Sequence, residues 1–263
     1  MSRPSPSTYT LTSPPKPIQV ANVVGDGFDA YMNAFWPWLE RGLGDFALQE
    51  ETLRTALGAL QDVLNHVGEK ILPHVDPLMH RLIAILRNDA VRREVKPQVL
   101  IAMGDVALAV EDEFAKYLPT VTEMFHGATQ LSINNTVVTR ANPGKDELLE
   151  EYNAELRMGI MEGLAGILTV SGSGVALANH LELLLQFCYD VTVDPHASRD
   201  MRKAAVSLVG DLAGGVPAQV VQPVVMTHQS WIRQLLETVR RERGGVDTAN
   251  YAWNKLSAIL PGF

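Results

Sequence analysis

The sequence predicts an all-α protein: a solenoid of antiparallel helix pairs wound into a right-handed superhelix. Apolar residues recur at helical spacing, i, i+3 and i+4, through most of the 263 residues. No Asn-Gly or Asp-Gly pair joins two alternating runs, which would be the strongest short-range sign of a β-hairpin. Several helical segments also resemble one another at a spacing near 43 residues. That spacing fits a HEAT or armadillo unit, which is made of stacked helices.

The apolar stripes group into pairs that cover nearly the whole chain. We expect a first helix at 26–46, pairs at 51–88, 95–131, 146–193 and 198–242, and a closing helix at 246–260. One pair cannot bury its apolar stripe alone, so neighbouring pairs must stack into one continuous core. Such an array curves, and its hollow side is the usual binding surface.

The internal repeat is most visible around three aspartates. Asp62, Asp105 and Asp211 occupy the same place in three similar segments, 58–64, 101–107 and 207–213. The polar, turn-rich segment 132–144 is the expected insertion that lengthens the later interval. Proline stands near the expected start of each following helix, at positions 73, 119 and 223. Proline is tolerated there because the first helical N–H has no partner within the helix.

The array is expected to span residues 26–263, after a disordered Ser/Pro-rich tail at 1–25. The tail has no apolar run and few basic residues, so it predicts neither a signal peptide nor a transit peptide. Two longer uncharged stretches, 163–181 and 212–232, are interrupted by Ser/Gly and by Pro/Gln/His respectively. Each is therefore expected to form two helices, and neither is expected to span a membrane.

The composition limits the function classes. The net charge is −8, which argues against a nucleic-acid-binding protein and leaves basic protein segments as partners. The single cysteine, Cys188, excludes an internal disulfide. The His-Glu-x-x-His pattern of a zinc enzyme is absent, and Ser173 follows no strand that could make a nucleophile elbow. We therefore expect no enzyme activity, no metal and no cofactor.

One long segment resembles a known family. Residues 91–110, Val-Arg-Arg-Glu-Val-Lys-Pro-Gln-Val-Leu-Ile-Ala-Met-Gly-Asp-Val-Ala-Leu-Ala-Val, and their continuation at 113–118 resemble the C-terminal part of importin beta (karyopherin beta). Segments 31–39 and 208–212 match the same family in the same order, and 153–157 is similar to the start of its next repeat. The resemblance covers roughly residues 28–260. It implies a HEAT-repeat module of a nuclear import receptor.

The resemblance also implies partners and a location. They are the basic importin-beta-binding helix of importin alpha, the Phe-Gly repeats of nucleoporins, and cargo proteins, met in the cytoplasm, the nucleus and the nuclear pore. Importin beta is a much longer superhelix, of which this chain supplies the last repeats. Its Ran-GTP-binding region lies mainly in the N-terminal repeats, so Ran-GTP binding is not expected here. The alternative is a HEAT-repeat scaffold without a transport role.

Four carboxylates are candidate contacts for a basic helix, because carboxylates bind Lys and Arg through charge-assisted hydrogen bonds. We expect them on the inner helices of the array; the alternative for each is a solvated helix surface. They are Asp76, Glu123, Glu182 and Glu237.

Aromatic residues form the second candidate set, because an aromatic face attracts a cation. The resemblance places a tryptophan near the C-terminus, and the alignment leaves both Tyr251 and Trp253 as its counterpart; Trp253 could instead cap the last repeat. Trp231 is expected to begin a helix with Ser230 as N-cap, as core or as a partner site. Trp36 and Trp38 are expected to be partly exposed. Candidate Phe-Gly grooves lie beside Leu57, Leu60, Val99 and Met103 by position only, and the favoured alternative is that these residues are ordinary core.

Overall fold

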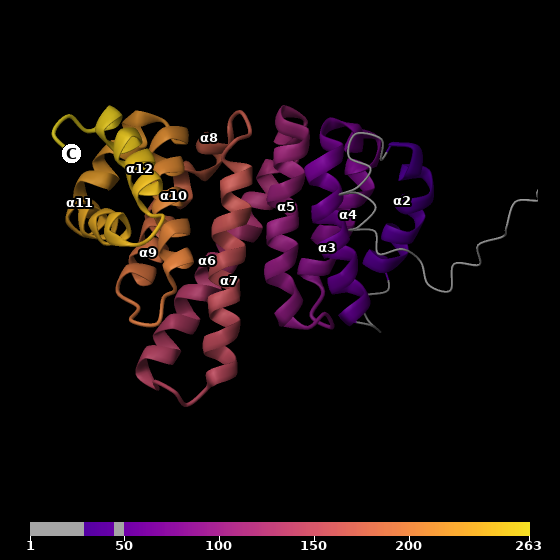
Figure 1. Cartoon of the computed structure of the whole chain (residues 1–263), viewed down its shortest axis with the longest axis horizontal. Helices are drawn as coiled ribbons and strands as arrows, with labels where there is room; N and C mark the ends of the chain where they lie inside the picture. The colour runs from indigo at the N-terminus through magenta and orange to yellow at the C-terminus, as the bar shows by residue number, and fades with distance from the viewer. Residues whose placement is uncertain (1–28, 45–49) are drawn as a thin grey trace, which may run out of the picture.

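The computed structural model describes residues 29–44 and 50–263, which form a curved array of helices (Figure 1). No strand occurs among these residues, and the predicted solenoid of helix pairs is confirmed. The predicted tail, 1–25, lies outside the described residues. The helices are α2 (Asp29–Gly44), α3 (Glu50–Val67), α4 (Val75–Arg87), α5 (Lys96–Val110), α6 (Leu118–Ala141), α7 (Glu147–Ile167), α8 (Ser173–Leu177), α9 (Leu181–Thr192), α10 (Arg199–Gly215), α11 (Ala218–Arg241) and α12 (Val246–Ile259), with 3₁₀ segments η2 (Gly68–His74), η3 (Arg93–Val95), η4 (Glu111–Tyr117) and η5 (Ala178–His180).

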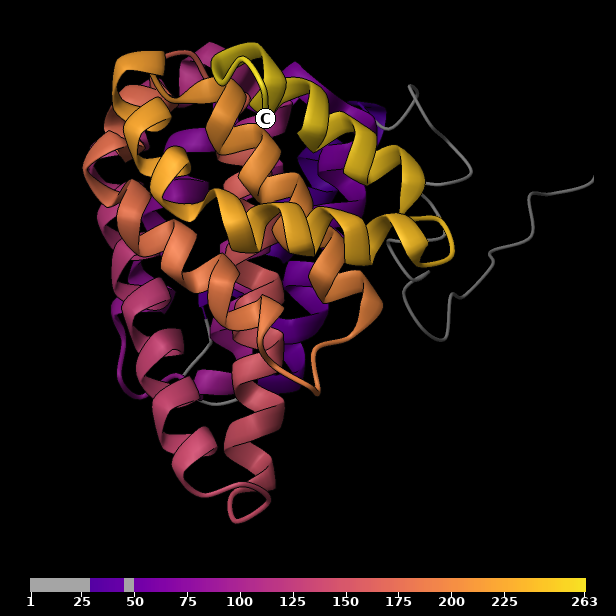
Figure 2. The same ribbon diagram turned by 90° about the vertical axis from the view of Figure 1, so that its left-hand side faces the viewer.

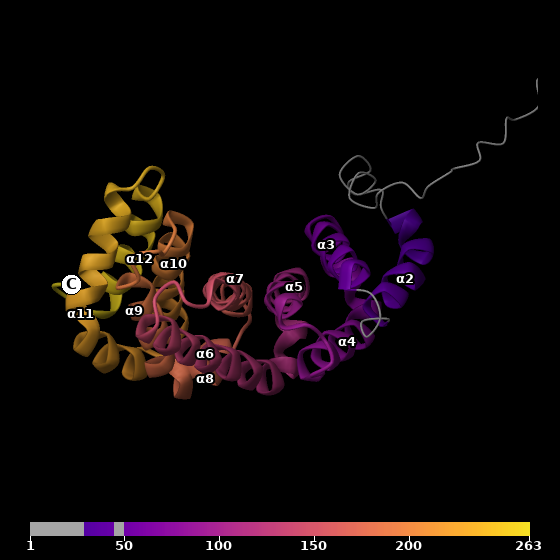
Figure 3. The same cartoon turned by 90° about the horizontal axis from the view of Figure 1, so that it is seen from below.

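The helices form two rows. Helices α3, α5, α7, α10 and α12 lie side by side on the inner side of the bend and are called the inner row (Figure 3). Helices α2, α4, α6, α9 and α11 follow the longer, outer side and are called the outer row. The first helix of each predicted pair therefore faces the hollow side in this part of the array.

Glycines allow close contacts between neighbouring helices of the inner row. A Cβ atom at Gly166 of α7 would lie 2.3 Å from the carbonyl oxygen of Gly104 on α5. A Cβ at Gly104 would lie 2.7 Å from the Cα of Gly163. Farther along, a Cβ at Gly210 would lie 2.9 Å from the Cα of Ala252. Side chains do not fit between these helices, so the inner row is short and the array bends toward it.

The core fills the space between the two rows. Leu57, Leu60, Val99 and Met103 are fully buried in it, and none of them lines either of the two grooves described below. The alternative that these four residues are core is confirmed, whereas a Phe-Gly groove beside them stays a prediction.

Segment 132–144 is not an insertion between helices. Helix α6 continues to Ala141, and it forms with α7 a long hairpin that projects beyond the other repeats (Figure 1 and Figure 2). The hydroxyls of Thr129 and Thr136 donate to the carbonyls four residues earlier, at 2.7 Å and 2.8 Å, so these buried hydroxyls have an acceptor within their own helix. The buried face of these turns is polar, which a search for apolar periodicity does not detect.

The predicted break before Trp231 is also wrong. Helix α11 runs without interruption from Ala218 to Arg241, so Ser230 is an exposed mid-helix residue and not an N-cap. The apolar stripe continues on both sides of the polar residues through Val221, Val225, Ile232 and Leu235, which are all buried. Within the described residues, no helix is both long and apolar enough to cross a membrane.

Candidate partner-binding surfaces

Three unpaired glutamates follow one face of α7. Its opposite face packs on α6, where the Asn153 amide reaches Thr136. Glu151, Glu155 and Glu162 are all exposed, and none of them has an ion pair among the described residues. They are spaced by four and seven residues, so they lie on one side of the helix. We call these three residues the α7 acidic stripe.

Neighbouring carboxylates add to the negative potential of this face. The Asp105 carboxylate on α5 accepts a hydrogen bond from the Gln61 amide at 3.1 Å, and burial raises the pKa of Asp105. Although the Glu162 side chain is exposed, the neighbouring helices partly desolvate its carboxyl and raise its pKa, and the negative charge of Asp105 raises it further. Two acids that repel each other's charge are a favourable place for a cation from outside.

An apolar groove lies beside the stripe on the inner row. Its volume is ≈ 470 Å³, and it lies between α5, α7 and α10. Pro97, Ile101, Met158 and Met201 line it, and Glu155 stands at its edge. We call it the inner groove. Apolar side chains next to unpaired carboxylates suit a partner that is both apolar and basic.

The four predicted carboxylates lie elsewhere. Asp76, Glu123, Glu182 and Glu237 are on α4, α6, α9 and α11, so they belong to the outer row, and their expected place on the inner side is wrong. The expectation failed because the first helix of each predicted pair, and not the second, lies on the inner side of the bend.

Each of these carboxylates is exposed and already has a cationic or imidazole partner. Lys116 Nζ lies 2.8 Å from Asp76 and lowers the pKa of that carboxyl, helped by the Tyr117 hydroxyl, which also donates to Asp76. Imidazole nitrogens lie 3.6 Å from Glu123 and 2.8 Å from Glu182, and Arg241 lies 3.4 Å from Glu237. Exposed ion pairs of this kind contribute little free energy, so a cationic side chain of another protein can replace the present partner of each carboxylate.

A second groove opens on the outer row, between α4 and α6. Its volume is ≈ 570 Å³, and α5 and α7 form its floor. Leu86, Leu100, Met124, Leu131 and Leu156 are among its apolar lining residues, and Glu123 is at its edge. We call it the outer groove. Of the predicted site residues, only Glu123 lines one of these two grooves.

The C-terminal aromatics face different neighbours. Tyr251 is 41% exposed, and its hydroxyl donates to Asp211 Oδ1 at 2.5 Å. Burial, strengthened by that hydrogen bond, raises the pKa of Tyr251 to about 12. Trp253 packs edge-on against Phe263, with ring centroids 5.3 Å apart, and the Arg240 guanidinium lies 5.8 Å from its ring. Tyr251 is the more accessible of the two to a partner.

The other tryptophans are mostly structural. Trp231 packs edge-on against Tyr189, with centroids 5.7 Å apart, and its indole nitrogen is buried. Trp36 is buried and lies 4.2 Å from the His74 ring, whereas Trp38 is 38% exposed. The expected partial exposure therefore holds for Trp38 and is wrong for Trp36, because Trp36 points toward the next helix pair.

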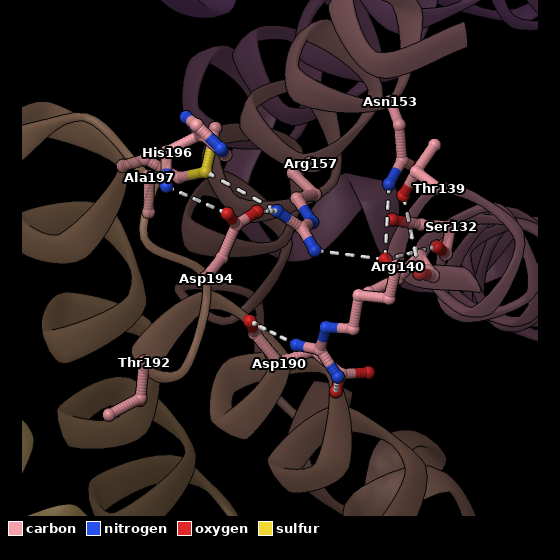
Figure 4. Close-up of polar contacts among 12 residues, drawn as sticks. Ser132, Thr139, Arg140, Asn153, Arg157, Asp190, Thr192, Asp194, His196 and Ala197 are labelled. Atoms are coloured by element: carbon pink, nitrogen blue, oxygen red, sulfur yellow. Dashed lines mark hydrogen bonds and ion pairs between the residues drawn. The ribbon is translucent and has the colours of Figure 1, made fainter. Parts of the chain in front are cut away.

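Sequence reasoning missed the α7 acidic stripe and a polar cluster between α6, α7 and the α9–α10 loop (Figure 4). The spacing of Glu151, Glu155 and Glu162 could have revealed the stripe. The cluster had no such signal, because its members Thr136, Arg157 and Asp194 lie far apart in the chain. Within the described residues, no group of three metal-ligating side chains is found.

Comparisons with known proteins agree on one family. A family model described as "Importin subunit beta-1-like, TPR repeats" matches residues 18–240. Importin subunit beta-1 of Arabidopsis thaliana is 30% identical over 204 residues, which are 76% of this chain and 22% of the relative. Importin subunit beta-1 of Schizosaccharomyces pombe is 27% identical over 238 residues, 88% of this chain and 26% of the relative.

The fold has the same neighbours. The solved structure titled "Kap95:Nup1 complex" superposes with a TM-score of 0.77 at 24% identity, covering 93% of this chain and 28% of that chain. This chain thus spans about a quarter of the length of the proteins it matches. The relatives are named as transport subunits, in agreement with the expectation that the chain is not an enzyme. The chain belongs to the importin subunit beta-1-like family and corresponds to part of its helical-repeat array.

Proposed function

We propose that this chain is a partner-binding module of a nuclear import receptor, and that its inner face holds a basic helix such as the importin-beta-binding segment of importin alpha. The observation that carries the proposal is the α7 acidic stripe beside the inner groove. Its three glutamates have no partner of their own, so a Lys or Arg side chain has no internal competitor there. The groove next to them takes apolar side chains of the same helix.

The outer carboxylates are weaker candidates for the same partner. A basic helix would have to displace the imidazoles at Glu123 and Glu182, or the Lys116 ammonium at Asp76, before it gained any contact. Tyr251 extends the inner face at its C-terminal end and could stack on an arginine, although Asp211 holds its hydroxyl. Family membership supports cargo proteins as further partners, and a location in cytoplasm, nucleus and nuclear pore.

The proposal can be tested by fluorescence anisotropy with a labelled importin-beta-binding peptide. We expect binding that weakens as salt rises, because the contacts are ionic. The double variant E155Q/E162Q should bind several-fold more weakly, since each charged contact contributes on the order of 1 kcal/mol. The matched control is E123Q/E182Q on the outer row, which should change affinity less. Absence of binding at micromolar peptide at low and moderate salt would reject the proposal.

A second function is supported by the outer groove. Its lining by Leu86, Met124 and Leu156 suits the phenylalanine of a Phe-Gly repeat, and the volume of ≈ 570 Å³ is ample for one ring. A Phe-Gly peptide titrated against the M124K variant should bind more weakly than it binds wild type, because the lysine would place a charge in the groove. An unchanged affinity would remove this groove from consideration.

The alternative function, a scaffold without a transport role, makes a different prediction. A scaffold would bind neither the basic peptide nor the Phe-Gly peptide, but would co-purify with another stable partner. The two peptide titrations therefore separate the alternatives, since binding of either peptide favours the transport module.

A further inference from the structure

The inner row is not held together evenly. Contacts between α5 and α7, and between α10 and α12, are dense and include backbone atoms, as at Gly104 and Gly210. Contacts between α7 and α10, which lie in the middle, are sparser, as are those between α3 and α5. We call α3 to α7 the N-terminal block and α9 to α12 the C-terminal block, because the regular alternation of long helices is interrupted between them. Between them the chain passes through the short helix α8, preceded by Gly172 in the left-handed region at φ 82°.

A polar cluster joins the two blocks at the base of the projecting hairpin (Figure 4). Arg157 of α7 donates from Nη1 to Asp194 Oδ2 at 2.5 Å and from Nη2 to Thr136 Oγ1 at 2.8 Å. Arg140 of α6 donates to Asp190 at the end of α9, at 3.0 Å. We call these residues, together with Asn153, the polar joint. Both arginines belong to the first block and both aspartates to the second.

The polar joint is incompletely satisfied. The single hydroxyl proton of Thr136 goes to the Ser132 carbonyl at 2.8 Å, so the oxygen can only accept from Arg157 and from the Asn153 amide nitrogen at 3.1 Å. The Asn153 side chain must therefore point its amide nitrogen at Thr136, which leaves its Oδ1 without a hydrogen-bond partner. Arg157 Nε has no partner either. Both side chains are more than nine-tenths buried. Buried polar atoms without partners destabilise the closed arrangement and gain hydrogen bonds when water enters.

Cavities lie on both sides of the joint. One, of ≈ 300 Å³, lies between the α6–α7 turn and the α9–α10 loop. The other is the inner groove, of ≈ 470 Å³. Met201 and His196 line both. Side chains beside a void lose packing contacts on that side, so Met201 and His196 gain less dispersion attraction than residues of a filled core.

We propose that the polar joint is the hinge of the array and that the Arg157–Asp194 pair is its latch. When the pair opens, the C-terminal block tilts away from the N-terminal block, and water reaches Asn153 Oδ1 and Arg157 Nε. Because the inner groove spans α5 and α7 of one block and α10 of the other, the tilt changes its width. The hinge is a property of the fold and does not depend on which partner the groove binds.

The test measures distances between the blocks in the full chain. Spin labels on T55C of α3 and N254C of α12, in a C188A background, report the distance across the joint. Labels on T55C and E162C report a distance within the N-terminal block. The variant D194N removes the latch charge but keeps the side-chain oxygen that accepts from the His196 backbone N–H at 2.9 Å, so the loop keeps its turn.

We expect D194N to widen the distance distribution across the joint by about twofold and to leave the distribution within the block unchanged. The matched control is E242Q, which breaks the Arg202–Glu242 pair inside the C-terminal block, 2.8 Å from Arg202 Nε. It should leave both distributions unchanged. The proposal is overturned if D194N and R157M leave the distance across the joint unaltered, or if E242Q widens it equally.

Hydrogen exchange gives an independent measurement without labels. In D194N, amides in segment 190–201 should exchange about tenfold faster than in wild type, because a charged hydrogen bond closes this region. Amides of α3 and α5 should keep their wild-type rates. An equal acceleration over the whole chain would mean global destabilisation and would count against a local hinge.

Discussion

On the inner row, α5 touches α7 and α10 touches α12 backbone to backbone, whereas neighbouring helices of the outer row are linked by exposed side-chain pairs. Gly104, Gly163 and Gly166 leave no room for side chains between α5 and α7. On the outer row, Glu123 reaches His180 and Glu182 reaches His228 across wider spaces. The bend of the array follows from this difference, because a closely packed row is shorter than a loosely packed one. The difference also predicts which substitutions the protein tolerates.

The largest effect is expected at the inner-row glycines. In the variant G166V, the new side chain would collide with the backbone of Gly104, which cannot move aside as a side chain could. We expect a loss of about 3 kcal/mol or more in the free energy of unfolding, measured by urea denaturation.

The control for this substitution lies on the outer row. Gly127 of α6 has no atom within 4 Å of its would-be Cβ, so G127A should be neutral or stabilise by up to about 1 kcal/mol. If both variants lost similar stability, close packing would not distinguish the two rows.

The next largest effect concerns the hairpin that connects the rows. Replacing Thr136 by valine keeps the shape but removes the oxygen that accepts from Arg157 and Asn153, so T136V should cost about 2 kcal/mol. The control is T129V: the Thr129 hydroxyl is also buried but only donates to its own helix at 2.7 Å. Its loss should cost less, and equal urea midpoints for the two variants would contradict a special role for Thr136.

A smaller, pH-dependent effect is expected at Tyr251 of the inner row. Its pKa is about 12, above the value of about 10 for an unfolded tyrosine. A raised pKa stabilises the folded state below pH 10, and this contribution is lost as the pH rises toward 12. The stability advantage of wild type over Y251F should therefore shrink in that range. Ultraviolet titration should show that Y251F lacks one late-ionising tyrosine, and an unchanged titration curve would refute the assignment.

The smallest effect is expected on the outer row. The variant E182Q removes an exposed pair with His228, and such pairs contribute at most about 1 kcal/mol. The difference from wild type in thermal unfolding should also shrink as salt is added. A large, salt-independent loss would show that the outer row is held more firmly than its exposed contacts indicate.

Much of the fold followed from the sequence. Apolar spacing predicted the helix pairs, and the similar segments around Asp62, Asp105 and Asp211 predicted the repeat, because both signals are read along the sequence. The site was less predictable. The four carboxylates chosen for the hollow side lie on the outer row, and the stripe that does lie on α7 was missed. Which helix of a pair faces inward depends on how neighbouring pairs pack, and no single pair contains that information.

The sequence by itself determined that the chain is helical, repetitive, acidic and related to importin beta. These properties depend on residue spacing and composition, which the order of residues shows directly. Only the tertiary structure determines which helices lie on the inner side of the bend, which groups pair with each carboxylate, and how the polar joint forms. Arg157 and Asp194, for example, lie 37 residues apart and meet only because α7 and α10 stack. Such contacts arise from the relative placement of whole helices, which a local pattern does not encode.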